Sequence, residues 1–296
     1  MKLVHVAVAV IERANGDICI AKRADHQHQG GLWEFPGGKV ESDETVTQAL
    51  AREIHEELGV IVLGHYPLIS VRYEYPDKHV LLDVHVVNEF EGEPHGKEGQ
   101  PVIWCPKDQL ASYSFPAANK GILNAILLPP YLAVTNELNQ PLIDGWGAHF
   151  SPKNLMIYLR EELNSNNQAL VLNLRAQGYR VTVKGADQES GYLHLSSAEL
   201  LATDDRPDVN WLSASCHNEE EVLKANALNV DFILLSPVNS TPTHPEVLGM
   251  GWPRFAELAL MAHMPVYALG GIGLDDMGVA KKNGAQGIAG ISAFLP

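Results

Sequence analysis

The sequence is short of cysteines, basic residues and long apolar runs, and each shortage excludes a class of protein. Only three of its 296 residues are cysteines, and Cys19, Cys105 and Cys216 lie far apart. An odd, scattered set argues against a disulfide framework and against a CxxC metal site, so a reducing, cytoplasmic setting is expected. No apolar run approaches the ~20 residues of a membrane helix, and Leu3–Ile11 is short for a signal peptide.

Positive charge is scarce relative to negative charge. The chain has 21 Lys and Arg against 36 Asp and Glu, a formal net charge of −15. Up to residue 128 there are 11 basic and 18 acidic residues, and the remainder has 10 and 18. Neither part offers the basic surface that duplex nucleic acid requires. An anionic ligand would therefore need a bridging metal or a few well-placed donors.

The length suggests two domains, at ~150 residues each. Pro129-Pro130 breaks the chain, which predicts domains at 1–129 and 130–296. In the first, a strand pair is expected, joined by a turn at residues 14–17, then a helix over 45–58 that Ser42 or Asp43 caps and Gly59 ends. Further along we expect strands over 60–75 and 78–90 with a turn at Pro76-Asp77, a loop over 91–101 and a helix over 119–128. The expected strand pair is Leu3–Ile11 with Ile18–Arg23.

The second part alternates strand-like apolar runs with helical stretches, which predicts a (β/α)8-like barrel. Parallel strands need a crossover of about a dozen residues, yet only Gly185–Gly191 separates the third run from the fourth. The link over 136–154 is long enough but rich in Pro and Gly. The barrel is therefore expected to have lost or remodelled its first and third helices. The eight runs are 131–135, 155–159, 179–184, 192–196, 211–216, 232–238, 266–270 and 287–294.

One motif carries more chemistry than any other. Residues 38–60 read GKVESDETVTQALAREIHEELGV. At 100° per residue, an apolar arc of this helix includes the positions of Glu53 and Glu57, with Glu56 at its edge. Half-buried carboxylates three and four residues apart repel one another unless a cation compensates them. Oxygen ligands suit a hard cation such as Mg²⁺, with Mn²⁺ an alternative, and Arg52 could orient part of the cluster.

This stretch resembles the signature of the Nudix hydrolases, because every fixed position of the 23-residue Nudix box is filled, Glu44 included. Residues 1 to about 128 are similar to MutT-type 8-oxo-dGTP diphosphatases, which implies an α/β/α sandwich. The resemblance implies that Glu53, Glu56, Glu57 and Glu98, with the carbonyl of Gly37, bind metal or serve as base. It also implies contacts to the nucleotide from Arg23, His28, Glu34, Phe35, Pro36, Gly37, Lys78 and Asn119.

Some of these assignments have simpler alternatives. Asn119 follows Pro116 and could be a helix cap, whereas its amide could equally read a purine edge with a donor and an acceptor. Lys78 stands where the family would have Arg, so a bidentate contact is weakened or absent there. His95 replaces an expected Trp and Trp33 an expected Leu. Because these departures change the shape of the pocket, the resemblance supports hydrolysis more strongly than a preference for 8-oxo-dGTP over dGTP.

Residues 131–296 resemble the thiamine-phosphate synthase and TenI-like barrels, through segments such as Ser213–His217 and Ala268–Ile272. The family's Lys two residues after Arg160 is replaced by Glu162, so an active synthase is not expected. Glycine-rich loops after the last two strands could bind phosphate through backbone N–H groups, or could simply be tight turns. His194 and His217 are interpreted as hydrogen-bonded core residues. The phosphate candidates are Gly270, Gly271, Gly273, Gly290 and Ser292.

Together these patterns predict an α/β protein in which a Nudix sandwich precedes a barrel. The expected activity is Mg²⁺-dependent hydrolysis of 8-oxo-dGTP to 8-oxo-dGMP and pyrophosphate, which keeps a mutagenic precursor out of DNA. The alternative is a Nudix hydrolase for another nucleoside diphosphate derivative, regulated by a barrel that binds a phosphorylated ligand. The expected partners are small molecules, with neither duplex nucleic acid nor a membrane.

Overall fold

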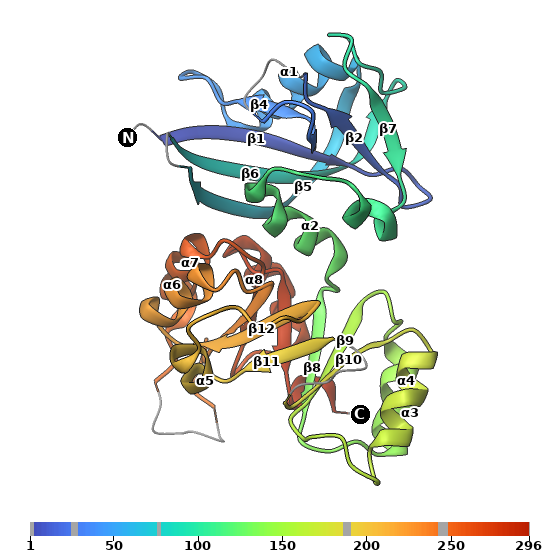
Figure 1. The fold of residues 1–296 in the computed structure, drawn as a ribbon, viewed down its shortest axis with the longest axis vertical. Helices are drawn as coiled ribbons and strands as arrows, with labels where there is room; N and C mark the ends of the chain where they lie inside the picture. Colours follow the sequence, from blue (N-terminus) through green and yellow to red (C-terminus); the bar gives the residue numbers. More distant parts are fainter. Residues whose placement is uncertain (1–2, 25–28, 76–77, 186–190, 242–247, 296) are drawn as a thin grey trace. The chain divides into compact units, whose positions relative to one another are not determined.

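A computed structural model describes residues 3–24, 29–75, 78–185, 191–241 and 248–295. The chain divides into two compact units, Met1–Leu127 and Leu128–Pro296 (Figure 1). His28 and the turn expected at Pro76-Asp77 lie outside the described residues.

The first unit contains two sheets. The larger has the strand order β4-β1-β6-β5, with β1 and β6 parallel and the other pairs antiparallel. Its strands are β1 (Leu3–Ile11), β4 (Gly37–Lys39), β5 (Ile61–Glu74) and β6 (His79–Glu91). The smaller sheet is antiparallel, in the order β3-β2-β7. Its strands are β2 (Ile18–Lys22), β3 (Trp33–Glu34) and β7 (Val102–Cys105).

The expected pairing of the first two strands is wrong, because β1 and β2 belong to different sheets. Glu12 and Ile18 form an isolated antiparallel bridge between them. The turn itself forms, with the Arg13 amide donating to the carbonyl of Asp17 over 3.1 Å. Both strands are largely buried, and each pairs with two other strands, so each is a central strand of its own sheet.

The larger sheet lies between helices, and the alternation along β1 shows it. Ala7 and Ala9 pack in one apolar cluster with Leu50 and Ile54 of α1 (Val46–Leu58). Val8 and Val10 point to the opposite face and share a cluster with Ile122 of α2 (Lys120–Leu127). A period of two along the strand therefore builds the α/β/α sandwich, with the short 3-10 helices η1 (Lys107–Ser112) and η2 (Ala117–Asn119) preceding α2.

The helix α1 starts and stops at well-defined caps. The N-cap is Thr45 and not Ser42 or Asp43, because the Thr45 side chain accepts from the amide of Gln48, whose own side chain accepts from the amide of Thr45. At the other end Gly59 adopts φ 70°, a left-handed conformation that favours glycine, and its amide donates to the carbonyl of His55. The predicted end at Gly59 is confirmed.

The second unit is an eight-stranded parallel sheet in the order β10-β9-β8-β15-β14-β13-β12-β11. The first strand of the unit, β8, pairs with the last, β15, which curls the sheet into a nearly closed barrel with a seam between β10 and β11. The mixed α/β class and the barrel architecture are confirmed. The strands are β8 (Tyr131–Thr135), β9 (Leu155–Leu159), β10 (Arg180–Val183), β11 (Tyr192–Leu195), β12 (Trp211–Cys216), β13 (Phe232–Leu235), β14 (Val266–Leu269) and β15 (Gly287–Gly290).

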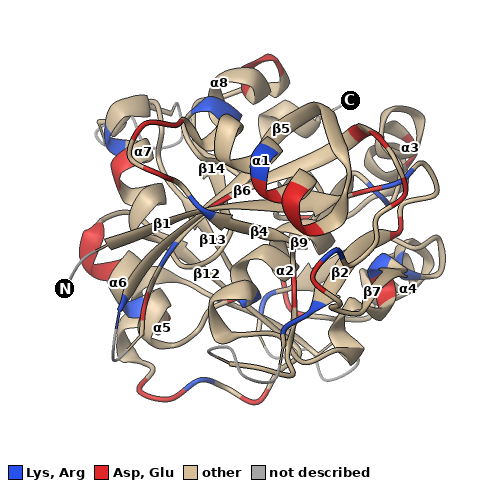
Figure 2. Ribbon diagram, turned by 90° about the horizontal axis from the view of Figure 1, so that it is seen from above, with Lys and Arg blue, Asp and Glu red and all other residues tan. Residues whose placement is uncertain are grey.

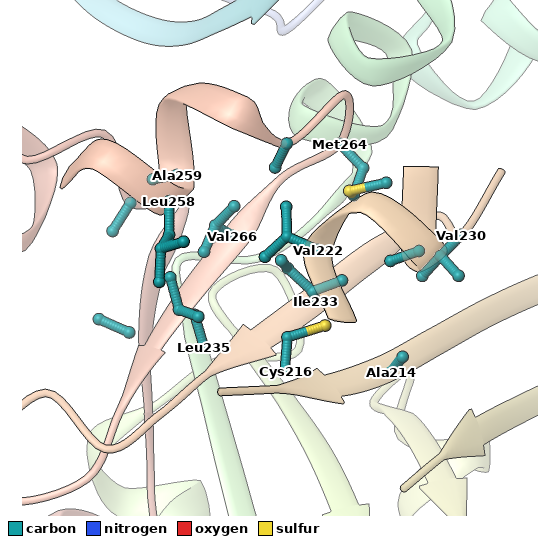
Figure 3. Packing of buried hydrophobic residues seen from close by; sticks show 14 of the residues in the cluster. Ala214, Cys216, Val222, Val230, Ile233, Leu235, Leu258, Ala259, Met264 and Val266 are labelled. Atoms are coloured by element: carbon teal, nitrogen blue, oxygen red, sulfur yellow. The ribbon is translucent and has the colours of Figure 1, made fainter. Parts of the chain in front are cut away.

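Alternate residues of each barrel strand fill two separate layers. Phe232 and Leu234 point into the barrel, where they pack with Tyr267. Ile233 and Leu235 point outward to the helices, in the cluster that Figure 3 shows around Val222. The helices are α3 (Gln140–His149), α4 (Gln168–Ala176), α5 (Ser197–Ala202), α6 (Glu219–Ala227), α7 (Gly251–Met261) and α8 (Met277–Lys282), with short 3-10 helices η3 (Leu274–Asp276) and η4 (Ser292–Phe294).

The first barrel helix was expected to be lost or remodelled, and its loss is wrong, because α3 occupies the link between β8 and β9. The Asn139 side chain caps it by accepting from the amide of Leu142 over 3.0 Å. Pro141 falls in the first turn, where its missing N–H costs nothing. Between β10 and β11, the described residues 184, 185 and 191 form no helix.

Candidate functional site

The helix α1 places its glutamates at three different depths. The side chain of Glu53 is 17% exposed, whereas that of Glu56 is 58% exposed. Glu57 is half-buried, one turn beyond Glu53. The amphipathic pattern therefore predicts their environment correctly, with two carboxylates beside the apolar face and one at its edge. Figure 2 shows this run of acidic residues on α1, next to a basic one.

The short strand β4 holds its backbone against these carboxylates. The Gly37 amide donates to Oε2 of Glu57 over 3.2 Å. A Cβ at Gly38 would lie 2.0 Å from Cδ of Glu53, so the absence of a side chain lets that carboxylate reach the strand. Gly37 itself has φ 149°, and a Cβ there would lie 2.1 Å from the carbonyl oxygen of Ala7 on β1. Both glycines are needed for this close packing.

Arg52 ties several carboxylates together. Its Nη2 contacts Oε1 of Glu44 at 2.6 Å and its Nε contacts Oε2 at 3.1 Å. Its Nη1 lies 2.9 Å from Oε1 of Glu53 and 3.2 Å from Oε2 of Glu56. The hydrogen bond from Arg52 holds the pKa of Glu44 below its ordinary value. This planar, bidentate arrangement fixes the orientation of the cluster more firmly than a lysine could.

Glu57 lies at the centre of the negative charge. Burial raises the pKa of its carboxyl group to about 8 against the opposing hydrogen bond from Gly37, and the charges of Glu34, Glu53 and Glu98 add to the rise. An isolated cluster of this kind carries unfavourable electrostatic energy, which a nearby cation would relieve.

The loop after β6 brings Glu98 to this cluster from far along the chain. It covers the last turn of α1, where the Lys97 amide donates to the carbonyl of Glu57 over 2.9 Å and the His95 amide to that of Leu58 over 3.2 Å. Gln100 contacts the same turn through Nε2, which donates to the carbonyl of Glu57 over 3.1 Å. Sequence reasoning missed Lys97 and Gln100, although helix ends need such partners for their free carbonyl groups.

The described residues include no group of three or more His, Cys, Asp or Glu side chains arranged to hold a metal ion. The donor chemistry nonetheless fits a hard divalent cation, because the candidate ligands are all carboxylate or carbonyl oxygens. The charge around Glu57 supports the same fit. In this structure the guanidinium of Arg52 and the amide of Gly37 contact the carboxylates that such an ion would bind.

Several residues expected at the nucleotide lie at or beside the ends of strands β2, β3, β4 and β6. Arg23 forms an ion pair with Glu34, and burial raises the pKa of Glu34 although Arg23 opposes the rise. Phe35 is buried and stacks on Phe115, with ring centroids 5.3 Å apart. The Nζ of Lys78 lies 5.6 Å from the centroid of the Tyr75 ring.

Asn119 ends η2 and is 8% exposed. It directly precedes α2, and the cap and base-contact interpretations both stay predictions. Pro36, also expected at the nucleotide, is buried, and its carbonyl accepts from the amide of Ala9.

In the barrel, backbone conformation and close packing require glycine at two positions of the loop after β14. Gly270 has φ 97° and Gly271 has φ 62°, and a Cβ at Gly271 would lie 2.7 Å from Cβ of Asn239. The Gly273 amide is already bonded to Oδ2 of Asp276 at 2.8 Å. Of the remaining candidates, Gly290 is buried at the end of β15 and Ser292 begins η4. The phosphate site stays a prediction.

The two barrel histidines differ. His194 is buried, with Nδ1 at 2.8 Å from the hydroxyl of Ser213 and Nε2 at 2.9 Å from that of Ser215. His217 is exposed, although its Nδ1 lies 2.7 Å from the carbonyl oxygen of Ser236. The core interpretation is therefore confirmed for His194 and wrong for His217, which follows the end of β12 and so lies beyond the barrel's interior layer.

Comparison with known proteins assigns the first unit to a family. Residues 7–125 match the model of the NUDIX domain. Over 124 residues the chain is 43% identical to the 8-oxo-dGTP diphosphatase of Escherichia coli K12, a match that covers 42% of this chain and 95% of that protein. The chain belongs to the Nudix family. It is a Nudix hydrolase, and enzymes of this family generally use a divalent metal ion.

Other Nudix relatives match the same part of the chain. The CTP pyrophosphohydrolase of Escherichia coli K12 is 38% identical over 128 residues, covering 43% of this chain and 93% of that protein. A solved structure from a study of MutT of Aliivibrio salmonicida and Vibrio cholerae is 37% identical, covering 42% of this chain and 97% of that one, with a TM-score of 0.38.

The second unit matches a different family. Residues 181–294 match the model of thiamine monophosphate synthase. A putative thiamine-phosphate synthase 2 of Aquifex aeolicus is 46% identical over 81 residues, 27% of this chain and 44% of that protein. The second unit is thus a domain like thiamine-phosphate synthase, joined to a Nudix hydrolase. None of the described helices is long and apolar enough to cross a membrane.

Proposed function

We propose that the first unit hydrolyses 8-oxo-dGTP to 8-oxo-dGMP and pyrophosphate with the help of Mg²⁺. The observation that carries the proposal is the carboxylate cluster around Glu57, which combines half-buried side chains with neighbouring charges from Glu34, Glu53 and Glu98. Nucleotide hydrolysis is also the activity in the names of the Nudix relatives, four of which from different organisms are 8-oxo-dGTP diphosphatases sharing 36–43% of aligned residues.

In this proposal, Glu53, Glu56, Glu57 and Glu98 hold Mg²⁺ together with the carbonyl oxygen of Gly37. When bound, the ion neutralises phosphate charge and lowers the pKa of water. Arg52 keeps Glu44, Glu53 and Glu56 oriented through its three ion pairs. One carboxylate of the cluster takes a proton from the attacking water.

The reaction balances as a simple hydrolysis. Oxygen of water forms a bond to the β-phosphorus, and the bond from that phosphorus to the α–β bridging oxygen breaks. The bridging oxygen leaves with the nucleoside monophosphate, while the β- and γ-phosphates leave as pyrophosphate. The carboxylate that took the proton returns it to solvent.

Asn119 and nearby aromatic rings would recognise the base. Asn119 is buried, and its amide has both a donor and an acceptor, as a purine edge requires. Phe35 and Phe115 offer stacked aromatic rings nearby in the same apolar cluster. Arg23, His28, Glu34, Pro36, Gly37 and Lys78 complete the proposed nucleotide contacts.

The deciding experiment measures pyrophosphate release by the full-length protein with Mg²⁺, using low micromolar 8-oxo-dGTP, dGTP and CTP. We expect a large preference for 8-oxo-dGTP, and Asn119→Ala should reduce it by about tenfold or more, the value of a good bidentate base contact. Asn88→Ala, at an exposed position on β6, is the matched control and should retain the preference. Equal slow hydrolysis of all three nucleotides would overturn the substrate assignment, and faster hydrolysis of CTP would favour the alternative substrate class.

A further inference from the structure

The loop that carries Glu98 is held against α1 by more than one kind of contact. Backbone amides of His95 and Lys97 donate to the carbonyls of Leu58 and Glu57, and the Nζ of Lys97 donates to that of His55 over 3.1 Å. These bonds fix the start of the loop. Glu98 itself is exposed and lies in a turn that one backbone hydrogen bond closes, from the amide of Gly99 to the carbonyl of Gly96 over 3.0 Å. Holding Glu98 in a single position needs a further contact.

Gln100 supplies such a contact, because its side-chain amide forms hydrogen bonds in two directions. Its Oε1 accepts from the amide of Glu98 over 2.9 Å, and its Nε2 donates to the carbonyl of Glu57 over 3.1 Å. One side chain thus connects the backbones of two carboxylates that lie 41 positions apart in the sequence.

The surrounding backbone leaves little room for another arrangement. A Cβ at Gly96 would lie 1.9 Å from the carbonyl oxygen of Gln100 and 2.9 Å from its Oε1. The loop therefore folds closely around Gln100, and glycine at position 96 permits it. Two hydrogen bonds and the close approach of Gly96 thus restrict the side chain of Gln100. A side chain restricted in this way can fix the position of the backbone that it contacts.

We propose that Gln100 is a positioning residue for Glu98, fixing that carboxylate relative to Glu57 so that both contribute to one divalent-cation site. The inference rests on the proposed function, because it assigns Glu98 to that site. It adds a residue outside the Nudix box that acts through the backbone and touches neither substrate nor ion. Removing such an outer contact typically costs 10-fold to 100-fold in metal affinity or activity.

The test compares Gln100→Leu, which keeps the volume and removes both hydrogen bonds, with Gln109→Leu, the same change at an exposed position of η1. The first readout is Mn²⁺ binding to the full-length protein without nucleotide. Binding is measured from the electron paramagnetic resonance signal of the free ion. We expect Gln100→Leu to weaken Mn²⁺ binding by about 10-fold or more and Gln109→Leu to leave it unchanged.

The second readout is a double-mutant cycle with Glu98→Gln. If Gln100 acts through Glu98, Gln100→Leu should lower kcat by about 10-fold in the wild-type background, with little change in KM, and should have almost no further effect once Glu98 is replaced. Thermal unfolding of each variant separates this from a general loss of structure. A structural role alone would lower the unfolding midpoint and leave the two substitutions additive.

The outcomes distinguish failure of the positioning role of Gln100 from failure of the proposed function. Normal Mn²⁺ binding and kcat in Gln100→Leu, while Glu98→Gln loses activity, would overturn the positioning role and leave the proposed function intact. Additive effects of the two substitutions would also overturn it. Full activity of Glu98→Gln would show that Glu98 does not belong to the cation site. The assignment of Glu98 to that site and the positioning role of Gln100 would then both be wrong.

Discussion

At the scale of single residues, the cluster on α1 joins burial to charge, and Glu53 is its best test. Its carboxylate is mostly covered, contacts Arg52 and packs against Gly38. Glu53→Gln keeps the shape and removes the charge, so we expect kcat to fall by roughly 100-fold or more with little change in the unfolding midpoint. Glu91→Gln, on an exposed part of β6, should behave as wild type in the same pyrophosphate assay. Near-normal turnover of Glu53→Gln would contradict the metal and base assignment.

A substitution at Gly38, which packs against the carboxylate of Glu53, tests the position of that carboxylate. An added methyl group would meet the carboxylate of Glu53 at about 2.0–2.3 Å, but the far end of a flexible side chain can move away at little cost in stability. We therefore expect Gly38→Ala to lower kcat by about 10-fold to 100-fold, as a misplaced catalytic group does, while urea unfolding changes little. Loss of stability in proportion to activity would show that the glycine serves the fold alone.

The residues also show what sequence can foretell about the site. Spacing on a helix placed Glu53 and Glu57 inside the apolar arc and Glu56 at its edge, because a 100° repeat fixes faces locally. The first two are half-buried as expected, whereas Glu56 is more exposed than a half-buried face implies. The bonds of Gln100 could not be foretold in this way, since they join segments 41 positions apart. Arg52 was expected to orient part of the cluster, and its simultaneous contacts with Glu44, Glu53 and Glu56 add a detail that only three-dimensional packing defines.

At the scale of elements, patterns within one segment predicted more than pairings between segments. The strands β8, β9 and β12 have the predicted limits, because continuous apolar runs of five or six residues are typical of buried parallel strands. The partners of β1 were predicted wrongly, since a turn signal at residues 14–17 does not reveal that each strand belongs to a separate sheet. The helix α3 was missed because Gly145, Gly147 and Pro141 all lower helix propensity.

The glycines of α3 allow a test of how helix propensity affects the stability of the barrel unit. Gly147 is exposed within the helix, and a Cβ there would meet nothing within 4 Å. Gly147→Ala should therefore stabilise the barrel unit by about 0.5–1 kcal/mol in urea unfolding. Gly178→Ala is the contrasting variant, because Gly178 has φ 93°, and it should destabilise the unit by about 1–2 kcal/mol. A destabilised Gly147→Ala would indicate that α3 is less regular than described.

At the scale of the whole molecule, two units of unrelated architecture share one acidic chain. Both carry an excess of negative charge, which Figure 2 shows as acidic residues spread over many elements. That composition suits a site that recruits divalent cations and is unfavourable for polyanions such as nucleic acid. The length, the Pro129-Pro130 break and the change of pattern after it predicted two domains, and the structure divides into two compact units between Leu127 and Leu128. A role for the barrel in regulating hydrolysis stays a prediction.

The barrel's interior makes its stability depend on pH. Burial, with a smaller effect of Arg160, lowers the pKa of His194 from 6.5 to about 3. Between those values the unfolded chain binds a proton that the folded chain does not. The contribution of His194 is thus present in full above pH 6.5 and is lost as pH falls toward 3, by up to about 1.4 kcal/mol per pH unit.

His194→Gln removes this titration while its amide can still bond to Ser213 and Ser215, the partners of the imidazole. Urea unfolding at pH 7.5, 6.5, 5.5 and 4.5 should therefore give a shallower loss of stability for His194→Gln than for the wild type. His149→Gln, the same change at an exposed position outside the barrel's interior, is the matched control and should follow the wild-type slope. Equal slopes for all three proteins would mean that His194 is protonated as readily in the folded barrel as in the unfolded chain, in conflict with its burial between two serines.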